Sequence, residues 1–410
     1  MELKNKKIAI LGYGIEGRDA QRFLEKQRAD VEILDVKFDK NYLRDLGRFN
    51  IVIRSPGVYR YLPELLEAEK NGVEISSAIK LFFDLCPAKI VGVTGTKGKG
   101  TTATLIYEIL KKAGKDVYLA GNIGKPYLEL LSVINSESLV VLELSSFQLI
   151  DLKKSPHIAV VLNITQDHLD WHKDIDEYTG AKKNIVRYQS TSDFAFINEE
   201  YEIPKSFAEE TKAKVIYFSG KTLNKKYRDG LLLRGEHNLE NVAAAVSVAD
   251  ILKVDEAAIL SVLQSFKGLP YRLELVDTVN GVTFYNDSFA TGPQPTIAAI
   301  KSFTEPETVI LGGSDKGLDY KELKQEIESR KNIKNLILIG EIGKKIGGGI
   351  KNKNIINLGK TSMNRIIEVA CEVTPKGGVV LLSPAAASFD MFANYKERGS
   401  AFKKAVLALK

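Results

Sequence analysis

Short apolar runs alternate with helix-like stretches along almost the whole chain, and this alternation constrains the fold more than any other feature. Runs such as "KIAILGYG", "KIVGVTG" and "TVILGGS" are each followed by a helical pattern before the next run begins. Strands separated by helical patterns are typical of parallel sheets with crossover helices. The sequence therefore predicts an α/β fold throughout.

The alternation falls into three series. The first extends from Lys7 to about Pro87, the second begins at "AKIVGVTG", and the third begins at "VTFYNDS". A chain of 410 residues is also longer than one hydrophobic core usually supports. We therefore predict three domains, 1–88, 89–268 and 269–410. The last boundary lies at "KGLPYRLE", whose Gly-Leu-Pro is typical of a linker.

Charge, cysteines and hydropathy limit the class of protein and its partners. The net charge of +6 comes from 58 basic and 52 acidic residues, a mild excess that favours anionic substrates. No basic run is interleaved with aromatic residues, so we expect no nucleic-acid partner. Cys86 and Cys371 lack metal-ligand spacing and fit packed thiols in a reducing compartment. Without a signal-peptide pattern or an apolar run of bilayer length, we expect a cytoplasmic protein with no membrane insertion.

The stretch "VGVTGTKGKGTT" resembles a phosphate-binding loop. Gly95, Gly98 and Lys99 lie between a strand and a helix, where backbone amides and a lysine can bind phosphate oxygens. Gly100 stands where the common pattern has Ser or Thr, and the hydroxyl of Thr101 comes one residue later. The structural alternative is a glycine-rich turn with a solvated lysine.

A second glycine-rich turn, "GYGIEG", also follows a strand and precedes a helix. Its glycines, with Asp35 at the end of the next strand, match the fingerprint of dinucleotide-binding folds. Three interpretations are open on spacing alone: an NAD or FAD site, a diphosphate site for another nucleotide, and a tight turn that merely needs glycine.

Polar residues at other strand ends are candidates for metal and ligand binding. The strand predicted in "VVLELSS" ends at Glu143, and His168 follows "VVLNITQD", so both could converge on a magnesium ion held against nucleotide phosphates. Lys182 has the local pattern of a surface lysine on a helix. Asn238 and Asn241 lie at a helix start, where Asn is an ordinary capping residue. "NDSFATGP", "GGSDKG" and "SPAAASFDMFANYKERG" are predicted ligand-facing loops or turns of the third segment.

Taken together, these motifs are similar to the Mur ligase family. Ten of them follow the family's order: "SPG", "GTKGKGTT", "GNIGKP", "LELSSFQL", "NITQDHLD", "GEHNLENVAAA", "GLPYRLE", "NDSFAT", "LGGSDKG" and "LSPAAASFDMFANYKERG". "LELSSFQL" and the last motif most resemble the D-glutamate-adding members. The resemblance implies a Rossmann-like UDP-binding domain, a central P-loop ATPase domain with a mostly parallel sheet, and a Rossmann-like C-terminal domain that binds the amino acid.

The resemblance also implies an activity. It is the ATP- and Mg²⁺-dependent ligation of D-glutamate to UDP-N-acetylmuramoyl-L-alanine through an acyl phosphate, in cytoplasmic peptidoglycan precursor synthesis, by a monomer. The implied catalytic residues are Lys99, His168, Lys182 and Lys316. The implied metal ligands are Thr101, Glu143, His168 and Lys182 as a carbamate. The implied ATP-binding residues are Gly95, Thr96, Lys97, Gly98, Lys99, Gly100, Thr101, Asn238, Asn241, Arg272 and Asp287. The implied substrate-binding residues are Gly14, Ile15, Glu16, Asp35, Lys37, Ser55, Gly57, Asn122, Thr291, Lys316, Ser388 and Tyr395.

The sequence departs from the D-glutamate-adding members in two motifs. Lys97 and Gly100 replace the usual Asn and Ser or Thr, and the "GKG" form is similar to folylpolyglutamate synthase. Phe289 replaces a usual Lys, which removes one cation near an acidic substrate. Competing hypotheses are a folylpolyglutamate synthase, an NAD-dependent oxidoreductase built on "GYGIEG", and an ATP-binding scaffold without catalysis. The oxidoreductase leaves the phosphate loop and its metal ligands unexplained, whereas the scaffold is consistent with Gly100 and Phe289.

Overall fold

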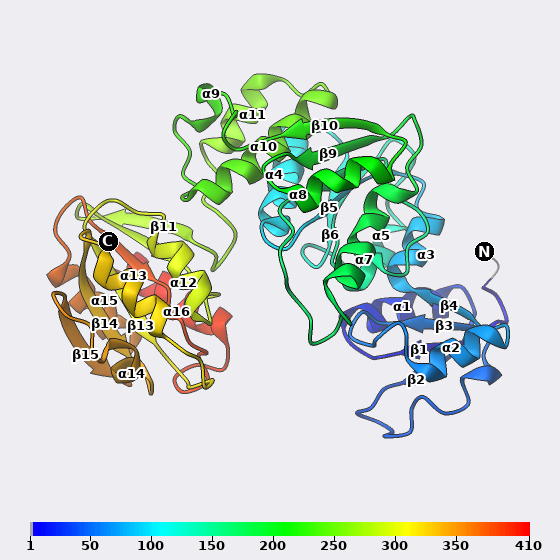
Figure 1. Cartoon of the computed structure of the whole chain (residues 1–410), viewed down its shortest axis with the longest axis horizontal. Helices are drawn as coiled ribbons and strands as arrows, with labels where there is room; N and C mark the ends of the chain where they lie inside the picture. Colours follow the sequence, from blue (N-terminus) through cyan, green and yellow to red (C-terminus); the bar gives the residue numbers. More distant parts are fainter. Residues whose placement is uncertain (1–2) are drawn as a thin grey trace. The chain divides into compact units, whose positions relative to one another are not determined.

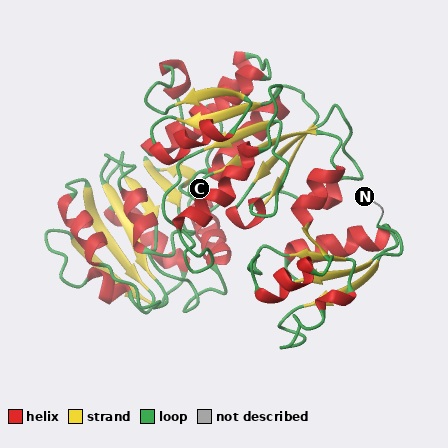
Figure 2. Ribbon diagram, turned by 45° about the vertical axis from the view of Figure 1, so that its right-hand side comes forward, coloured by secondary structure: helices red, strands yellow, loops and turns green. Residues whose placement is uncertain are grey.

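The computed structural model describes residues 3–410, which form three β-sheets with helices on their faces (Figures 1 and 2). The prediction of an α/β fold with mostly parallel sheets is confirmed. The chain divides into two compact units, one of residues up to Asn224 with Glu240–Val262, the other of Lys225–Leu239 with Leu263–Lys410. Each predicted segment contains one sheet, and the first two sheets share a unit. The division into three domains stays a prediction. Within the described residues, no helix has the length and apolar character to cross a bilayer.

The N-terminal sheet has four parallel strands in the order β2-β1-β3-β4. The strands are β1 (Lys7–Leu11), β2 (Asp30–Leu34), β3 (Ile51–Arg54) and β4 (Glu74–Ser77), and the helices are α1 (Ile15–Lys26), η1 (Leu46–Arg48), α2 (Pro63–Lys70) and α3 (Ala78–Leu85). Alternate residues of β1 enter different cores. Ile8 and Ile10 pack with α1 and α3, whereas Ala9 and Leu11 pack with α2.

The central sheet has six parallel strands in the order β10-β9-β8-β5-β7-β6. The strands are β5 (Lys89–Thr94), β6 (Val117–Gly121), β7 (Leu139–Glu143), β8 (Ile158–Val161), β9 (Phe194–Asn198) and β10 (Lys214–Phe218). The helices between this sheet's first strand and the C-terminal sheet are α4 (Lys99–Lys112), α5 (Tyr127–Leu130), α6 (Ser146–Leu149), α7 (Ile175–Arg187), α8 (Glu202–Lys205), η2 (Ser206–Glu210), α9 (Lys225–Arg228), α10 (Glu236–Ile251) and α11 (Glu256–Leu263). Of these, α9 and residues 236–239 of α10 belong to the second unit.

The C-terminal sheet has the order β11-β12-β16-β13-β14-β15 and is parallel except for its first pair. The strands are β11 (Glu274–Val279), β12 (Val282–Asn286), β13 (Glu307–Gly312), β14 (Ile333–Ile339), β15 (Asn354–Gly359) and β16 (Val379–Leu382). The helices are α12 (Pro293–Ile300), α13 (Lys321–Ser329), α14 (Gly343–Gly347), α15 (Met363–Val373) and α16 (Tyr395–Leu407). Val309 and Leu311 pack with α12 and α13, and Ile310 packs with α15 and α16, so the sheet is covered on both faces.

Strand order places the predicted motifs where ligands bind in such sheets. In the central sheet, β5 lies between β7 and β8, so the order reverses beside the loop that follows β5. The same reversal occurs at β1 in the N-terminal sheet and at β13 in the C-terminal sheet. Crevices at the carboxyl ends of strands beside such reversals are the usual ligand sites of open α/β sheets. "GYGIEG", "GTKGKG" and "GGSDKG" each occupy one of them.

Candidate functional site

The glycine-rich loop between β5 and α4 has a backbone shape suited to phosphate. Gly95 and Gly98 have φ angles of 156° and 85°, which residues with side chains rarely adopt. A Cβ atom on Gly98 would also lie 2.3 Å from Asn241 Oδ1. The amine of Lys99 donates to the carbonyl oxygens of Gly95 and Thr96, each at 3.1 Å. The loop thus combines a lysine amine with the amino end of a 14-residue helix, the two features that bind phosphate.

The threonine hydroxyls of this loop differ in exposure. Thr102 is buried, and its Oγ1 donates to Asn241 Oδ1 at 3.1 Å. Thr96 is also buried, with its Oγ1 2.9 Å from the hydroxyl of Tyr178. Thr101 is partly exposed in the first turn of α4. Among these three threonines, Thr101 is therefore the one that is not buried, and its role as a metal ligand stays a prediction.

Lys182 is buried against the phosphate loop, which corrects the prediction of a surface lysine. It is 1% exposed, and its Nζ donates to Gly95 O at 2.9 Å. Burial lowers the pKa of Lys182 well below its ordinary value, and the positive charge of Lys99 lowers this pKa further. The negative charges of Asp167 and Glu143 act in the opposite direction. The prediction was wrong because α7 turns this position toward β5, and a neutral amine is favoured there.

Glu143 is the last residue of β7, and His168 lies in the segment after β8; these two strands flank β5. Glu143 is buried, whereas the His168 side chain is 47% exposed and lies edge-on to the ring of Phe147, with 4.8 Å between centroids. In the described part of the chain, no three His, Cys, Asp or Glu side chains form a metal site. The predicted metal set also uses the hydroxyl of Thr101 and a carbamate on Lys182, so it stays a prediction.

Three further residues that the sequence assigns to ligand binding have the following surroundings. Lys97 is exposed, and its Nζ lies 3.5 Å from Asp167 Oδ2. Asn122 directly follows β6, at the carboxyl edge of the central sheet. Asn238 lies in the first turn of α10, and its Nδ2 donates to Arg234 O at 2.7 Å. Their assignment to ATP and to the sugar nucleotide stays a prediction.

A pocket of 420 Å³ lies at the carboxyl end of the N-terminal sheet. Its volume is in the range of small-molecule sites. Asp35 organises its walls, because its carboxylate accepts the backbone N–H groups of Tyr13 at 2.6 Å and Lys37 at 2.9 Å. These bonds lower the pKa of Asp35. The structure brings seven predicted sugar-nucleotide residues together in the lining: Gly14, Ile15, Glu16, Asp35, Lys37, Ser55 and Gly57.

Asp287 is the buried acid at the carboxyl end of β12. Ser383 Oγ donates to its Oδ2 at 2.8 Å, and the backbone N–H of Leu273 donates to its Oδ1 at 3.1 Å. Burial raises the pKa of Asp287 to about 7, although these hydrogen bonds and the charges of Arg272 and Arg398 act in the opposite direction. The carboxyl group is therefore poised between its neutral and charged forms near neutral pH.

This raised pKa predicts a pH-dependent stability. The pKa of Asp287 rises from 3.8 to about 7 on folding, so the folded state binds more protons between these values. The free energy of unfolding contributed by this group therefore falls as the pH rises from about 4 to 7. D287N removes this titration. We therefore expect the free energy of unfolding of D287N, relative to that of wild type, to increase by on the order of a few kcal/mol as the pH rises from 4 to 8.

Denaturant titrations of the full chain across this pH range test the expectation. D277N is the control, because Asp277 is paired with Lys410 at 2.5 Å and its pKa is lowered by that contact. The pKa shift of Asp277 has the opposite sign to that of Asp287. D277N should therefore be less stable than wild type above about pH 4. A difference between wild type and D287N that is constant with pH would contradict the prediction.

The aromatic ring of Phe289, at the position where the sequence resemblance predicts a lysine, contacts the side chain of Arg272. The guanidinium carbon of Arg272 lies 3.8 Å from the centroid of its ring, and the ring of Tyr395 lies edge-on at 5.0 Å. Such a cation–π contact contributes about 0.5–1 kcal/mol at an exposed site. A positive charge therefore remains beside position 289, supplied by Arg272.

The other predicted amino-acid ligands lie on neighbouring loops of the C-terminal sheet. A bridge between Ser314 and Ala387 joins the loop after β13 to the loop after β16. Lys316 is exposed on the first loop, and Ser388 is buried on the second. Thr291 is partly buried just before α12. The structure thus brings the loops of Lys316 and Ser388 together, and their role as ligands stays a prediction.

Sequence reasoning missed two buried arginines. Arg398 is 1% exposed and donates to Ser288 Oγ at 3.0 Å, to Ser288 O at 2.9 Å and to Ala386 O at 3.1 Å. Arg54 is fully buried and paired with Asp151. The residues next to each arginine in the sequence give no sign that its side chain is buried. Only the partners that are distant in sequence, Asp151 for Arg54 and Ser288 for Arg398, explain the burial.

Two family models match the chain. Residues 93–230 match the Mur ligase middle domain, and residues 271–386 match the Mur ligase, glutamate ligase domain. The chain is 40% identical to a UDP-N-acetylmuramoylalanine--D-glutamate ligase from Acetivibrio thermocellus, with 99% of this chain and 97% of the relative covered. It is 37% identical to the ligase of the same name from Clostridioides difficile, with 100% of both chains covered.

Solved structures at lower identity share the fold. UDP-N-acetylmuramate-alanine ligase from Thermotoga maritima has a TM-score of 0.61 at 19% identity, covering 99% of this chain and 100% of that one. A MurF ligase from Thermotoga maritima in complex with ADP has a TM-score of 0.60 at 18% identity, covering 100% and 97%. Because the curated relatives match along their whole length at more than a third of positions, the chain belongs to the Mur ligase family.

Proposed function

We propose that the chain joins D-glutamate to UDP-N-acetylmuramoyl-L-alanine at the expense of ATP, through an acyl-phosphate intermediate, in peptidoglycan precursor synthesis. The observation that carries this proposal is the full-length match, at 36–40% identity, to relatives that bear the name of this ligase. In this proposal residues 1–88 bind the UDP-sugar, residues 89–268 bind ATP, and residues 269–410 bind the amino acid.

The residues around the phosphate loop fit ATP with magnesium. The loop offers the amine of Lys99 and the amino end of α4, and the buried amine of Lys182 is favoured in the neutral form that reacts with carbon dioxide. The carbamate would give an oxygen donor near Glu143. Thr101, Glu143, His168 and this carbamate would hold Mg²⁺, and most of these donors are the oxygen ligands that Mg²⁺ prefers. When bound, Mg²⁺ neutralises charge on the ATP phosphates.

The first chemical step joins two anions. An oxygen of the L-alanine carboxylate bonds to the γ-phosphorus, and the bond to the bridging oxygen breaks to release ADP. Lys99 stabilises the charge on the transferring phosphoryl group. In the second step, the D-glutamate amine attacks the acyl carbon, phosphate leaves, and the amine proton is lost to give an amide. Lys316 supplies positive charge for a carboxylate of D-glutamate, and Arg272, which stacks on Phe289, supplies positive charge for an ATP phosphate.

Phosphate release and product mass test the proposal directly. Purified protein with ATP, Mg²⁺ and UDP-N-acetylmuramoyl-L-alanine should release phosphate when D-glutamate is added, and the product should have the mass of the UDP-linked amide. Parallel reactions contain L-glutamate, L-lysine or meso-diaminopimelate instead. Release only with a folate and L-glutamate would favour the folylpolyglutamate synthase, and no release with any acceptor would favour an ATP-binding scaffold.

A further inference from the structure

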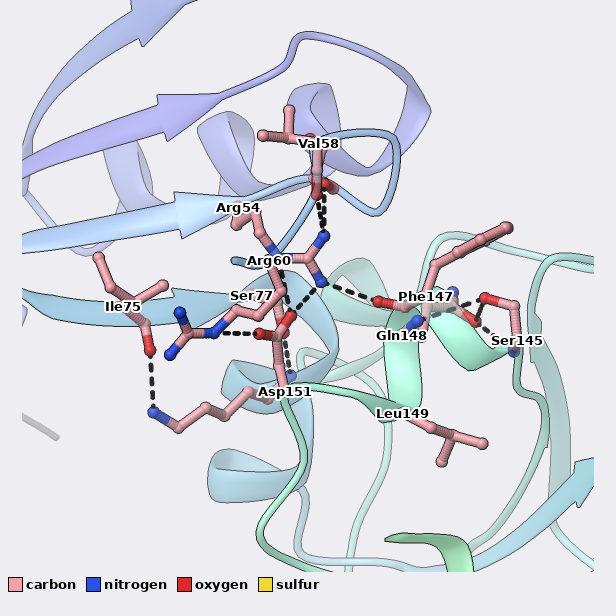
Figure 3. A network of polar contacts seen from close by, with 12 residues as sticks. Arg54, Val58, Arg60, Ile75, Ser77, Ser145, Phe147, Gln148, Leu149 and Asp151 are labelled. Carbon is pink, nitrogen blue, oxygen red and sulfur yellow. Dashed lines mark hydrogen bonds and ion pairs between the residues drawn. The ribbon is translucent and has the colours of Figure 1, made fainter. Parts of the chain in front are cut away.

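Helix α6 contacts one wall of the N-terminal pocket through Arg54 (Figure 3). The Arg54 side chain is fully buried at the end of β3. Its Nη1 donates to the carbonyl oxygens of Ser55, at 3.2 Å, and Val58, both in the pocket lining. Its Nη2 donates to Phe147 O in α6 at 2.8 Å, and its guanidinium pairs with Asp151 just beyond this helix. One side chain therefore ties the pocket loop to α6.

The same helix contacts a second part of the pocket lining, Glu16, through Gln148. Its Nε2 donates to Glu16 Oε1 at 2.7 Å, and Glu16 lines the pocket at the start of α1. The second oxygen of Glu16 accepts the hydroxyl of Tyr127. Gln148 is itself fixed, because its Oε1 accepts the backbone N–H of Ser145 at 2.9 Å in the capping box of α6. Two segments of the pocket lining, Glu16 and the loop from Ser55 to Val58, are thus held by a helix of four residues.

Helix α6 is also directly connected to the phosphate site. It begins three residues after Glu143, the last residue of β7. Glu143 pairs in register with Val93, two residues before Gly95 of the phosphate loop. A displacement of α6 would therefore move the pocket walls away from the strand ends that flank the loop. Reaction by proximity is sensitive to shifts on the order of 1 Å.

We propose that Arg54 and Gln148 are positioning residues that hold the sugar-nucleotide pocket in register with the phosphate loop through α6. This inference rests on the proposed function, because it assigns the pocket to the nucleotide whose attached carboxylate must reach ATP. Neither side chain touches the reacting atoms. Their effect is exerted through the Ser55–Val58 loop and through Glu16.

Two substitutions break the two links with little other change. Q148E keeps an acceptor for the backbone of Ser145 but loses the donor to Glu16 and opposes two carboxylates. R54K keeps the positive charge but loses the planar fork that bonds three carbonyl groups at once. We expect each variant to raise KM for the UDP-linked substrate about tenfold, as the loss of a hydrogen bond to a charged group would. KM for ATP should change less than about twofold.

Matched controls separate positioning from stability. R60K alters the other arginine beside Asp151, since Arg60 Nε lies 3.3 Å from Asp151 Oδ1. Arg60 also pairs with Glu69 and lies over the ring of Tyr61. Q27E makes the same chemical change as Q148E at an exposed position after α1. Both controls should keep the wild-type KM values. A purely structural role of Arg54 or Gln148 would lower the melting temperature and the active fraction while KM for both substrates stayed at the wild-type value.

The experiment measures kcat, both KM values and the melting temperature for wild type and the four variants. If R54K does not fold, Q148E decides the outcome. A KM for the UDP-linked substrate in Q148E equal to that of Q27E would overturn the inference. Wild-type turnover in the same series tests the proposed function separately. If wild type makes no product, calorimetry of UDP binding to the same variants tests whether Arg54 and Gln148 hold the pocket in place. The absence of UDP binding by wild type would overturn both proposals.

Discussion

K99M should lower the rate of phosphate release by roughly 10²–10³-fold. The amine of Lys99 lies at the amino end of α4, within 3.1 Å of two loop carbonyl oxygens. It is therefore placed to contact the phosphates that this backbone would bind. Methionine retains the length of the side chain but cannot stabilise the negative charge of the transferring group. The loss should fall mainly on kcat, because this charge is greatest in the transition state.

Phosphate release under saturating substrates measures this effect, and K112M is the matched control. Lys112 ends the same helix and is exposed, so its loss removes an equal charge far from the loop. K112M should retain nearly wild-type kcat, with at most the small stability loss of a cation at a helix C-terminus. If K99M and K112M had the same kcat, the loop would not be the phosphate site.

Most strands could be predicted from the sequence because buried parallel strands are nearly continuous apolar runs. The strands β4, β6 and β15 were not predicted. β11 was not predicted, although a signal for it exists. It pairs with β12 through a hairpin turn at Asn280 and Gly281, whose φ angles are 52° and 82°. Asn-Gly is the typical pair for such a two-residue turn. The strand itself carries Glu274 and Asp277, so its composition resembles that of a loop, and its pairing partner defines it.

The parts of the site that could be predicted are those whose residues are close together in the sequence. The phosphate loop and the glycine-rich turn after β1 are local motifs, whereas the partners of Arg54 and Arg398 are distant in sequence. Lys182 is an intermediate case. Tyr178, Ala181, Lys182 and Ile185 follow the spacing of one helix face, and all four are buried. A lysine within an apolar stripe was the available signal that this side chain faces the interior.

K182R should abolish most of the ligase activity, with a loss on the order of 10–100-fold in kcat if the carbamate is needed to hold the metal. The amine of Lys182 can attack the carbon of carbon dioxide, lose a proton and become an anionic carbamate. Burial and the charge of Lys99 favour the neutral amine that this reaction needs. Arginine introduces a positive charge at this position and cannot form the carbamate. It would therefore repel the metal ion that the modified lysine would bind.

Labelled bicarbonate distinguishes this chemistry from a simple loss of a buried lysine. Wild type equilibrated with ¹³C-bicarbonate should give a carbamate carbon signal in the NMR spectrum, and K182R should not. K183R is the matched control, because Lys183 is the next residue of α7 and pairs with Glu210 at 3.0 Å. This variant should keep both the signal and the activity. An active K182R, or full wild-type activity without any carbamate signal, would contradict the assignment and leave Lys182 as an amine that supports the loop through Gly95 O.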